Sequence, residues 1–112
     1  MGAVSSVSFA AGKIENATTE EVKIEIDNAI KSTEDAIAAI QNNDGQDSIL
    51  GLIKDAKQAS KKIESNRLDV KRNRAAARLA KARSAVKKGE NDSAIAFLSE
   101  ALAGYQEIKT LF

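Results

Sequence analysis

The spacing of the apolar residues constrains this chain more than any other feature. From Val22 almost to the C-terminus they recur three and four positions apart, which places them on one face of an α-helix. The first such stripe runs from Val22 to Ile40 and stops at residues 42–45 (NNDG), a sequence typical of a turn. Because proline is absent and alanine is frequent, we expect helix along most of the chain.

Further stripes follow at residues 49–63, 68–86 and 94–112. Asp47 is predicted to cap the second helix, and Gly89 is suited to the left-handed residue that ends the third. No residue near positions 65–66 forbids a helix. However, the stripe loses its phase there, so we predict a turn rather than one continuous helix.

The chain contains two similar halves. The segment AIQNNDGQDSI at residues 39–49 aligns with AVKKGENDSAI at residues 85–95, with small gaps. Each half would form a helical hairpin, and neither hairpin can bury its apolar stripe alone. We therefore predict an all-α fold, an antiparallel four-helix bundle made of two similar helical hairpins, over residues 18–112.

Residues 1–17 are predicted to precede the bundle as a flexible tail or as the remnant of a signal peptide. Ala3–Gly12 is small and mildly apolar, and Ser8-Phe9-Ala10 resembles the end of a secretory signal. A signal remnant would indicate an exported, periplasmic protein, whereas a plain tail would indicate a cytoplasmic one. No apolar run approaches the roughly 18 residues that a transmembrane helix needs.

The side chains that perform most enzyme chemistry are missing. The sequence has no cysteine and no histidine, which excludes thiol chemistry and removes the commonest general base and transition-metal ligand. Its serines therefore lack an obvious base, and no glycine-rich phosphate loop occurs. We predict no catalytic residue, no metal ligand and no cofactor, and hence a non-enzymatic binding or structural module with an unidentified partner.

The charge is unevenly distributed. Residues 61–88 contain eleven basic and two acidic residues, while the rest of the chain contains six basic and fourteen acidic residues. The candidate anion-binding residues are Lys71, Arg74, Arg78, Lys81 and Lys88.

Such a basic third helix could bind nucleic acid, or the acidic surface of a protein or a lipid membrane. No aromatic residue lies among these charges to stack on bases, so nucleic acid is possible but not favoured. The alternative is a solvated helix face that is neutralised by the acidic first helix or by another molecule.

Two segments carry a resemblance to a known family: AIKSTEDAIAAIQNNDGQDSILGLIKDAKQA (residues 29–59) and ARSAVKKGENDSAIAFLSEALAGYQEI (residues 82–108). They resemble the small metal-binding protein family, periplasmic four-helix bundles of two similar hairpins, which implies this fold and export. That family binds divalent transition metals through many histidines along its helices. Here Ser32, Lys57 and Lys87 are among the residues on comparable stretches, so the resemblance supplies no metal ligand.

Residues 82–105 are also similar to a tetratricopeptide helical pair. The first helix of such a pair is rich in small residues, and Ala94, Leu98 and Ala101 occupy the second. This resemblance implies a protein-interaction module that presents a concave surface to peptides.

Overall fold

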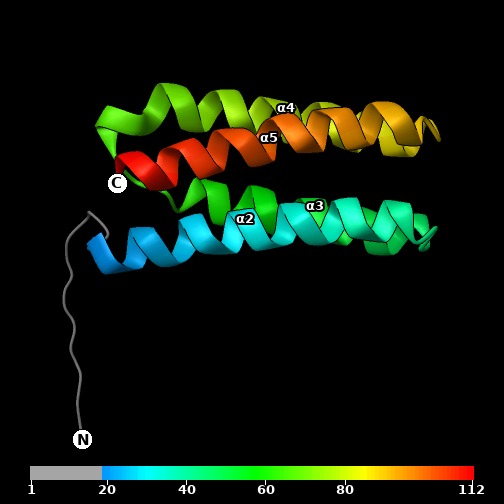
Figure 1. Cartoon of the computed structure of the whole chain (residues 1–112), viewed down its shortest axis with the longest axis horizontal. Coiled ribbons are helices and arrows are strands. Elements are labelled where there is room, and N and C mark those ends of the chain that lie inside the picture. The colour runs from blue at the N-terminus through cyan, green and yellow to red at the C-terminus, as the bar shows by residue number, and fades with distance from the viewer. Residues whose placement is uncertain (1–18) are drawn as a thin grey trace, which may run out of the picture.

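The computed structural model describes residues 19–112, so Ala3–Gly12 and the rest of the predicted tail lie outside the described residues. The described part of the chain forms four α-helices and no strand (Figure 1). The helices are α2 (Thr19–Gln41), α3 (Gln46–Lys61), α4 (Asp69–Lys87) and α5 (Asn91–Leu111). A short 3₁₀ turn at Asn66–Leu68 leads into α4, which confirms the predicted break between the second and third helices.

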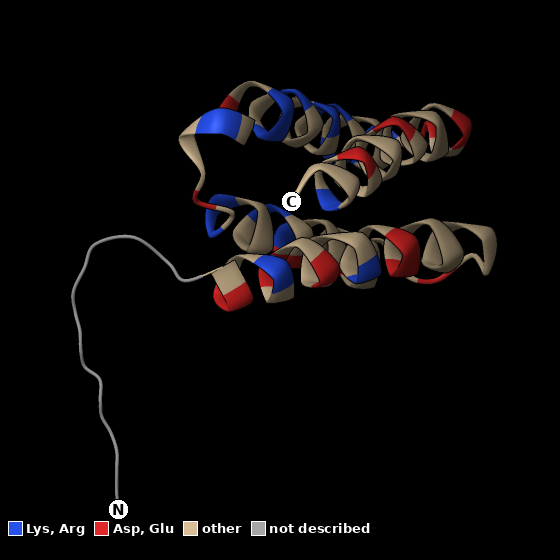
Figure 2. Cartoon of the chain, turned by 60° about the vertical axis from the view of Figure 1, so that its left-hand side comes forward, with Lys and Arg blue, Asp and Glu red and all other residues tan. Residues whose placement is uncertain are grey.

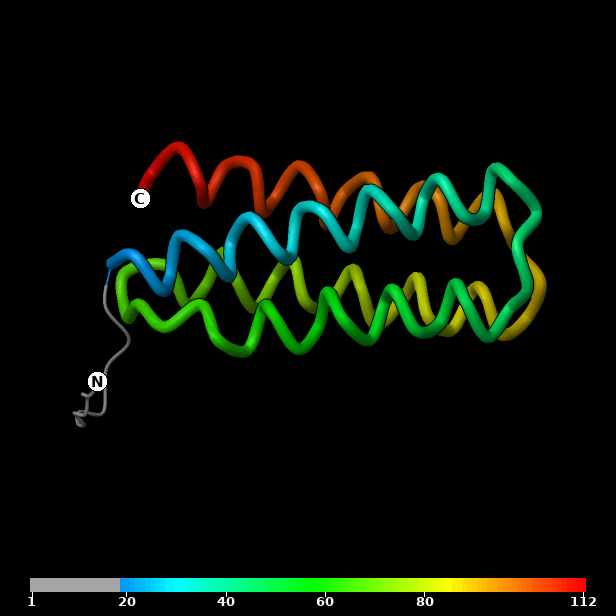
Figure 3. The backbone as a smooth tube through the Cα atoms, turned by 90° about the horizontal axis from the view of Figure 1, so that it is seen from below, coloured from blue at the N-terminus to red at the C-terminus, as the bar shows by residue number. Residues whose placement is uncertain are grey.

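The helices form a closed antiparallel ring. α2 packs on α3 and α4 on α5 as two hairpins, and the ring is completed by contacts of α2 with α5 and of α3 with α4. Figure 3 shows the turns of both hairpins at one end of the bundle, and the α3–α4 connection with the C-terminus at the other. The predicted antiparallel four-helix bundle of two similar hairpins is confirmed. Within residues 19–112, no helix is both long and apolar enough to cross a membrane.

One apolar core runs along the bundle and follows the predicted stripes closely. In α2 the small residues Ala36 and Ala39 are buried, whereas the larger Ile30 and Ile37 of the apolar stripe are half-buried at the edge of the core. Small residues allow close packing of the helices. At Gly104 of α5, an added Cβ would lie only 3.1 Å from the Cβ of Ala75 in α4.

The turns of the two hairpins repeat one geometry. Asn43 and Gly89 both adopt positive φ, at 59° and 75°. Around Gly89, the amide of Glu90 donates to the carbonyl of Ala85 and that of Gly89 to Val86, which is the hydrogen-bond pattern of a Schellman motif. The equivalent bonds surround Asn43, 46 residues earlier. The predicted duplication is thus visible in the backbone.

One sequence prediction at a helix end is wrong. Gly45, not Asp47, occupies the N-cap of α3, and Asp47 lies in the first turn, where its charge suits the helix dipole. Tyr105 of α5 is fully buried in the core. Burial raises the pKa of Tyr105 to about 12, against smaller lowering effects of Ser60 and Arg72.

Candidate anion-binding surface

Positive charge is concentrated on α4. That helix carries seven basic residues and one carboxylate, whereas α2, diagonally across the ring, carries two basic residues and six carboxylates. Figure 2 shows this division as blue bands along α4 and mostly red bands along α2. The question for function is which of the α4 cations are available to a partner.

Two of the five predicted residues are neutralised inside the protein. Lys71 lies 2.8 Å from the Glu107 carboxylate, and the Arg78 guanidinium lies 2.7 Å from that of Glu100. Lys71 and Arg78 flank the buried α4 stripe on the side that faces α5, and Glu100 and Glu107 are two turns apart on α5. The helix repeat therefore brings the two pairs together along one seam.

Arg74 lies between these two pairs. Together with Lys71 and Arg78 it borders a shallow hollow over Gly104, which Glu100 and Glu107 also line. Lys71 is the main cause of the lowered pKa of Glu107, through a hydrogen bond and its charge, and Arg74 adds a smaller effect. A partner anion at this hollow would meet two glutamates as well as three cations.

The remaining two predicted residues lie apart from this group. The Lys81 ammonium is 5.8 Å from the centroid of the Phe97 ring of α5, a cation–π distance. Lys88 is exposed at the C-cap of α4, where a cation suits the helix dipole. The predicted residues therefore do not form one unpaired surface, and the neutralising carboxylates come from α5 rather than from the acidic first helix.

A different set of cations lines the seam between α3 and α4. On α4, Arg83 and Lys87 each follow directly after a buried residue of the core stripe, Ala82 and Val86. This is the flank opposite to Lys71 and Arg78, so it faces α3. On α3 the same one-residue offset applies: the buried residues Ile53, Ala56 and Ser60 are followed by Lys54, Lys57 and Lys61.

Two hydrogen bonds fix how α3 and α4 lie against each other. The Gln46 side-chain amide donates to the carbonyl of Val86 (2.8 Å), and the Arg72 guanidinium donates to the carbonyl of Ile63 (2.9 Å). Gln46 is thus level with the end of α4, and Ile63 with its beginning. Between them, the antiparallel register places Arg83 level with Leu50.

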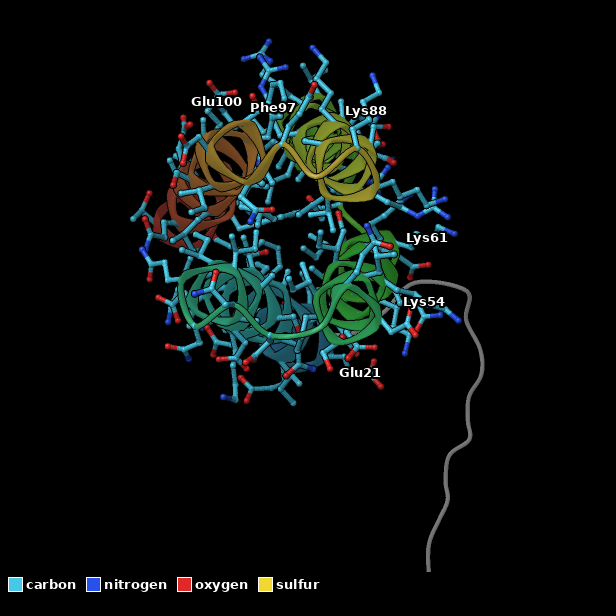
Figure 4. All side chains as sticks on the ribbon, turned by 90° about the vertical axis from the view of Figure 1, so that its right-hand side faces the viewer. Glu21, Lys54, Lys61, Lys88, Phe97 and Glu100 are labelled. Atoms are coloured by element: carbon cyan, nitrogen blue, oxygen red, sulfur yellow. The ribbon has the colours of Figure 1, made fainter. Side chains whose placement is uncertain are left out.

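This register puts five cations in one row along the seam: Lys61, Lys57, Lys54, Arg83 and Lys87. We call this set the basic row. Next to the lysines of α3, the residues of α4 at the seam are Ala76 and Ala80. Next to Arg83 and Lys87 of α4, the residues of α3 at the seam are Leu50 and Gln46. Figure 4, viewed along the bundle, shows Lys54 and Lys61 on the same side of the molecule, away from Phe97 and Glu100.

The basic row has no ion-pair partner among residues 19–112. Over the part of the chain that the structure describes, no carboxylate lies within 4.0 Å of any of its five charged groups. Lys61 borders a hollow that Glu21, Glu25 and Glu64 also line. Lys57 is half-buried and the other four side chains are exposed.

Sequence reasoning missed this row because it considered α4 alone. The row becomes visible only when the flank of α4 is combined with the flank of its neighbour. The available signal was the identity of the residue that follows each core position on α3 and α4.

Other kinds of site find little support in the described residues. Among residues 19–112, no group of three or more His, Cys, Asp or Glu side chains is arranged to hold a metal ion. No protein-family model and no curated protein matches the sequence, and no solved structure matches the fold. The resemblances to the small metal-binding and tetratricopeptide families therefore stay predictions.

Proposed function

We propose that this protein is a non-enzymatic binding module that holds an anionic macromolecule along the basic row. The observation that carries the proposal is the alignment of five cations on one seam, none of which pairs with a carboxylate among residues 19–112, while Lys71 and Arg78 on the opposite flank of α4 are paired with glutamates. Charges that only keep a helix soluble need no such alignment. Exposed lysine and arginine side chains attract anions electrostatically, and binding of this kind requires no catalytic group.

The internal duplication offers a comparison within the same chain. The α2–α5 seam is the counterpart of the α3–α4 seam, with α2 positions 46 residues before α4 and α3 positions 45 before α5. At the equivalents of Lys57 and Arg83 the α2–α5 seam has Leu102 and Ile37, both half-buried. Ile30 and Ile95 also pack against the core at this seam.

The fold can therefore close this kind of seam with aliphatic side chains, and at α3–α4 it carries cations instead. Such an exchange gives up apolar burial, which is worth roughly 1.5–3 kcal/mol for a fully buried aliphatic side chain. A binding role would explain why one of two equivalent seams forgoes that stabilisation. The proposal concerns this seam and not the whole basic surface of α4.

The proposal is tested by the salt dependence of binding to a simple polyanion, a thymidine oligonucleotide of about 20 nucleotides. If all five cations contact phosphates, log K should fall with log salt concentration with a slope of about −3.5. Replacing Lys54, Lys57, Arg83 and Lys87 by Gln should remove most of this slope.

A matched control replaces Lys71, Arg74, Arg78 and Lys81 by Gln, which removes the same formal charge from the opposite flank and outer face of α4. This variant should keep most of the slope. Equal losses in the two variants would refute the assignment to the basic row. Failure of the unmodified protein to bind at low salt would refute anion binding of this kind.

A further inference from the structure

The spacing of the basic row identifies the kind of anion that fits it. At 1.5 Å per residue, neighbouring cations are about 4.5–6 Å apart along the bundle axis, and the whole row spans about 22 Å. Neighbouring cations on the same helix are three or four residues apart. Between the helices, Arg83 is level with Leu50, which lies four residues before Lys54. Each step is therefore close to one helical turn. The row thus repeats with the pitch of an α-helix.

We propose that the partner is an acidic α-helix of another protein, which lies along the α3–α4 seam with one carboxylate opposite each cation. The proposal rests on the proposed function and specifies its ligand. A helix with carboxylates at alternating three- and four-residue spacing presents them on one face at this pitch, and about 16 residues cover the row. Ion pairs can then form at every turn without bending either partner.

The floor of the seam suits a helix. Ala76 and Ala80 on α4 have short side chains, and Leu50 on α3 is half-buried. A partner helix can approach this floor closely and place its own small apolar residues between the ion pairs, as helices do in a groove between two others.

Nucleic acid fits the same surface less well. Duplex DNA carries one charge per roughly 1.7 Å of its axis, much denser than one cation per helical turn. Proteins that hold single strands use aromatic side chains between their cations, and the row contains none. Phe97 lies on the α5 side, against Lys81. A bilayer surface is broad, whereas the row is one cation wide.

The test uses two alanine-based helical peptides of equal composition, each of about 20 residues with five glutamates. In the patterned peptide the glutamates follow one face at the spacing of the row, and in the scrambled peptide they are spread around the helix. At low salt the patterned peptide should bind at least about tenfold more tightly. Lys57→Gln with Arg83→Gln should remove this preference, whereas Lys71→Gln with Arg78→Gln should preserve it. Circular dichroism of both variants confirms that each is folded.

The same protein samples are titrated with the thymidine oligonucleotide and with phosphatidylserine vesicles. Equal binding of the two peptides, with oligonucleotide binding that depends on Lys57 and Arg83, would refute the acidic helix and leave the proposed function standing. Vesicle binding tighter than that of the patterned peptide would refute it in favour of a lipid surface. No binding to any probe would refute both proposals.

Discussion

Replacing two cations of the basic row by the residues of the equivalent seam should make the protein more stable and weaken anion binding. The double variant Lys57→Leu with Arg83→Ile gives the α3–α4 seam the residues that the α2–α5 seam has at Leu102 and Ile37. Full burial of such a side chain is worth roughly 1.5–3 kcal/mol, and the counterparts Leu102 and Ile37 are half-buried, so the two replacements together should add at most about 1.5–3 kcal/mol. Among residues 19–112 no carboxylate pairs with Lys57 or Arg83, so the variant breaks no ion pair of the described part of the chain.

Urea denaturation followed by circular dichroism measures this change. The midpoint should rise at an unchanged slope, and the melting temperature should rise by about 4–8 °C for each kcal/mol gained. Lys81→Leu on the outer face of α4 is the control and should change stability by no more than about 0.5 kcal/mol. A double variant that is less stable than the original protein would show that the two seams are not equivalent, and the argument from duplication would fail.

Three further outcomes follow from the core, the charges and the ligand set. Leu98→Ala removes a fully buried side chain and should cost about 2–5 kcal/mol in denaturation, more than Ile37→Ala, which is half-buried, while Lys81→Ala should stay within about 0.5 kcal/mol. Lys71 holds the pKa of Glu107 below its ordinary value, so the contribution of this pair to stability is present above the ordinary carboxylate pKa and is lost as the pH falls through the lowered one. Carboxyl NMR titration of Lys71→Gln should show the pKa of Glu107 returning upward, whereas Lys81→Gln should leave it in place. Since the chain has no histidine and no cysteine, calorimetric titration with copper(II) or nickel(II) should reveal no site tighter than about millimolar. A saturable micromolar site would restore the metal-binding role that the family resemblance implies.

Much of the fold could be predicted from the sequence, because helical periodicity and duplication are local signals. The stripes at three- and four-residue spacing located all four helices, and the glycine at position 89 indicated the end of the third. The apolar pattern alone does not show which residues of α2 are buried most deeply. Alanines such as Ala36 and Ala39 contribute little to an apolar pattern, yet their small size lets them be buried where helices approach most closely.

The candidate site could be predicted only in part, because it depends on which helices become neighbours. The sequence of α4 alone identifies its apolar stripe and its basic residues. It could not show that Glu100 and Glu107 of α5 would meet Arg78 and Lys71, since these partners are 22 and 36 residues apart in the chain. Nor could it show that lysines of α3 would continue the row begun by Arg83 and Lys87, because that continuity depends on the register between two antiparallel helices.

NMR mapping of the bound surface distinguishes the α3–α4 seam from the rest of α4 as the binding site. Amide resonances of the ¹⁵N-labelled protein are followed while the patterned acidic peptide is added at low salt. We expect the largest shifts on residues 54–61 of α3 and 83–87 of α4, on the two sides of one seam. Largest shifts at residues 71–81 and on the facing part of α5, with little change in α3, would contradict this expectation and return the binding site to the surface predicted from α4 alone.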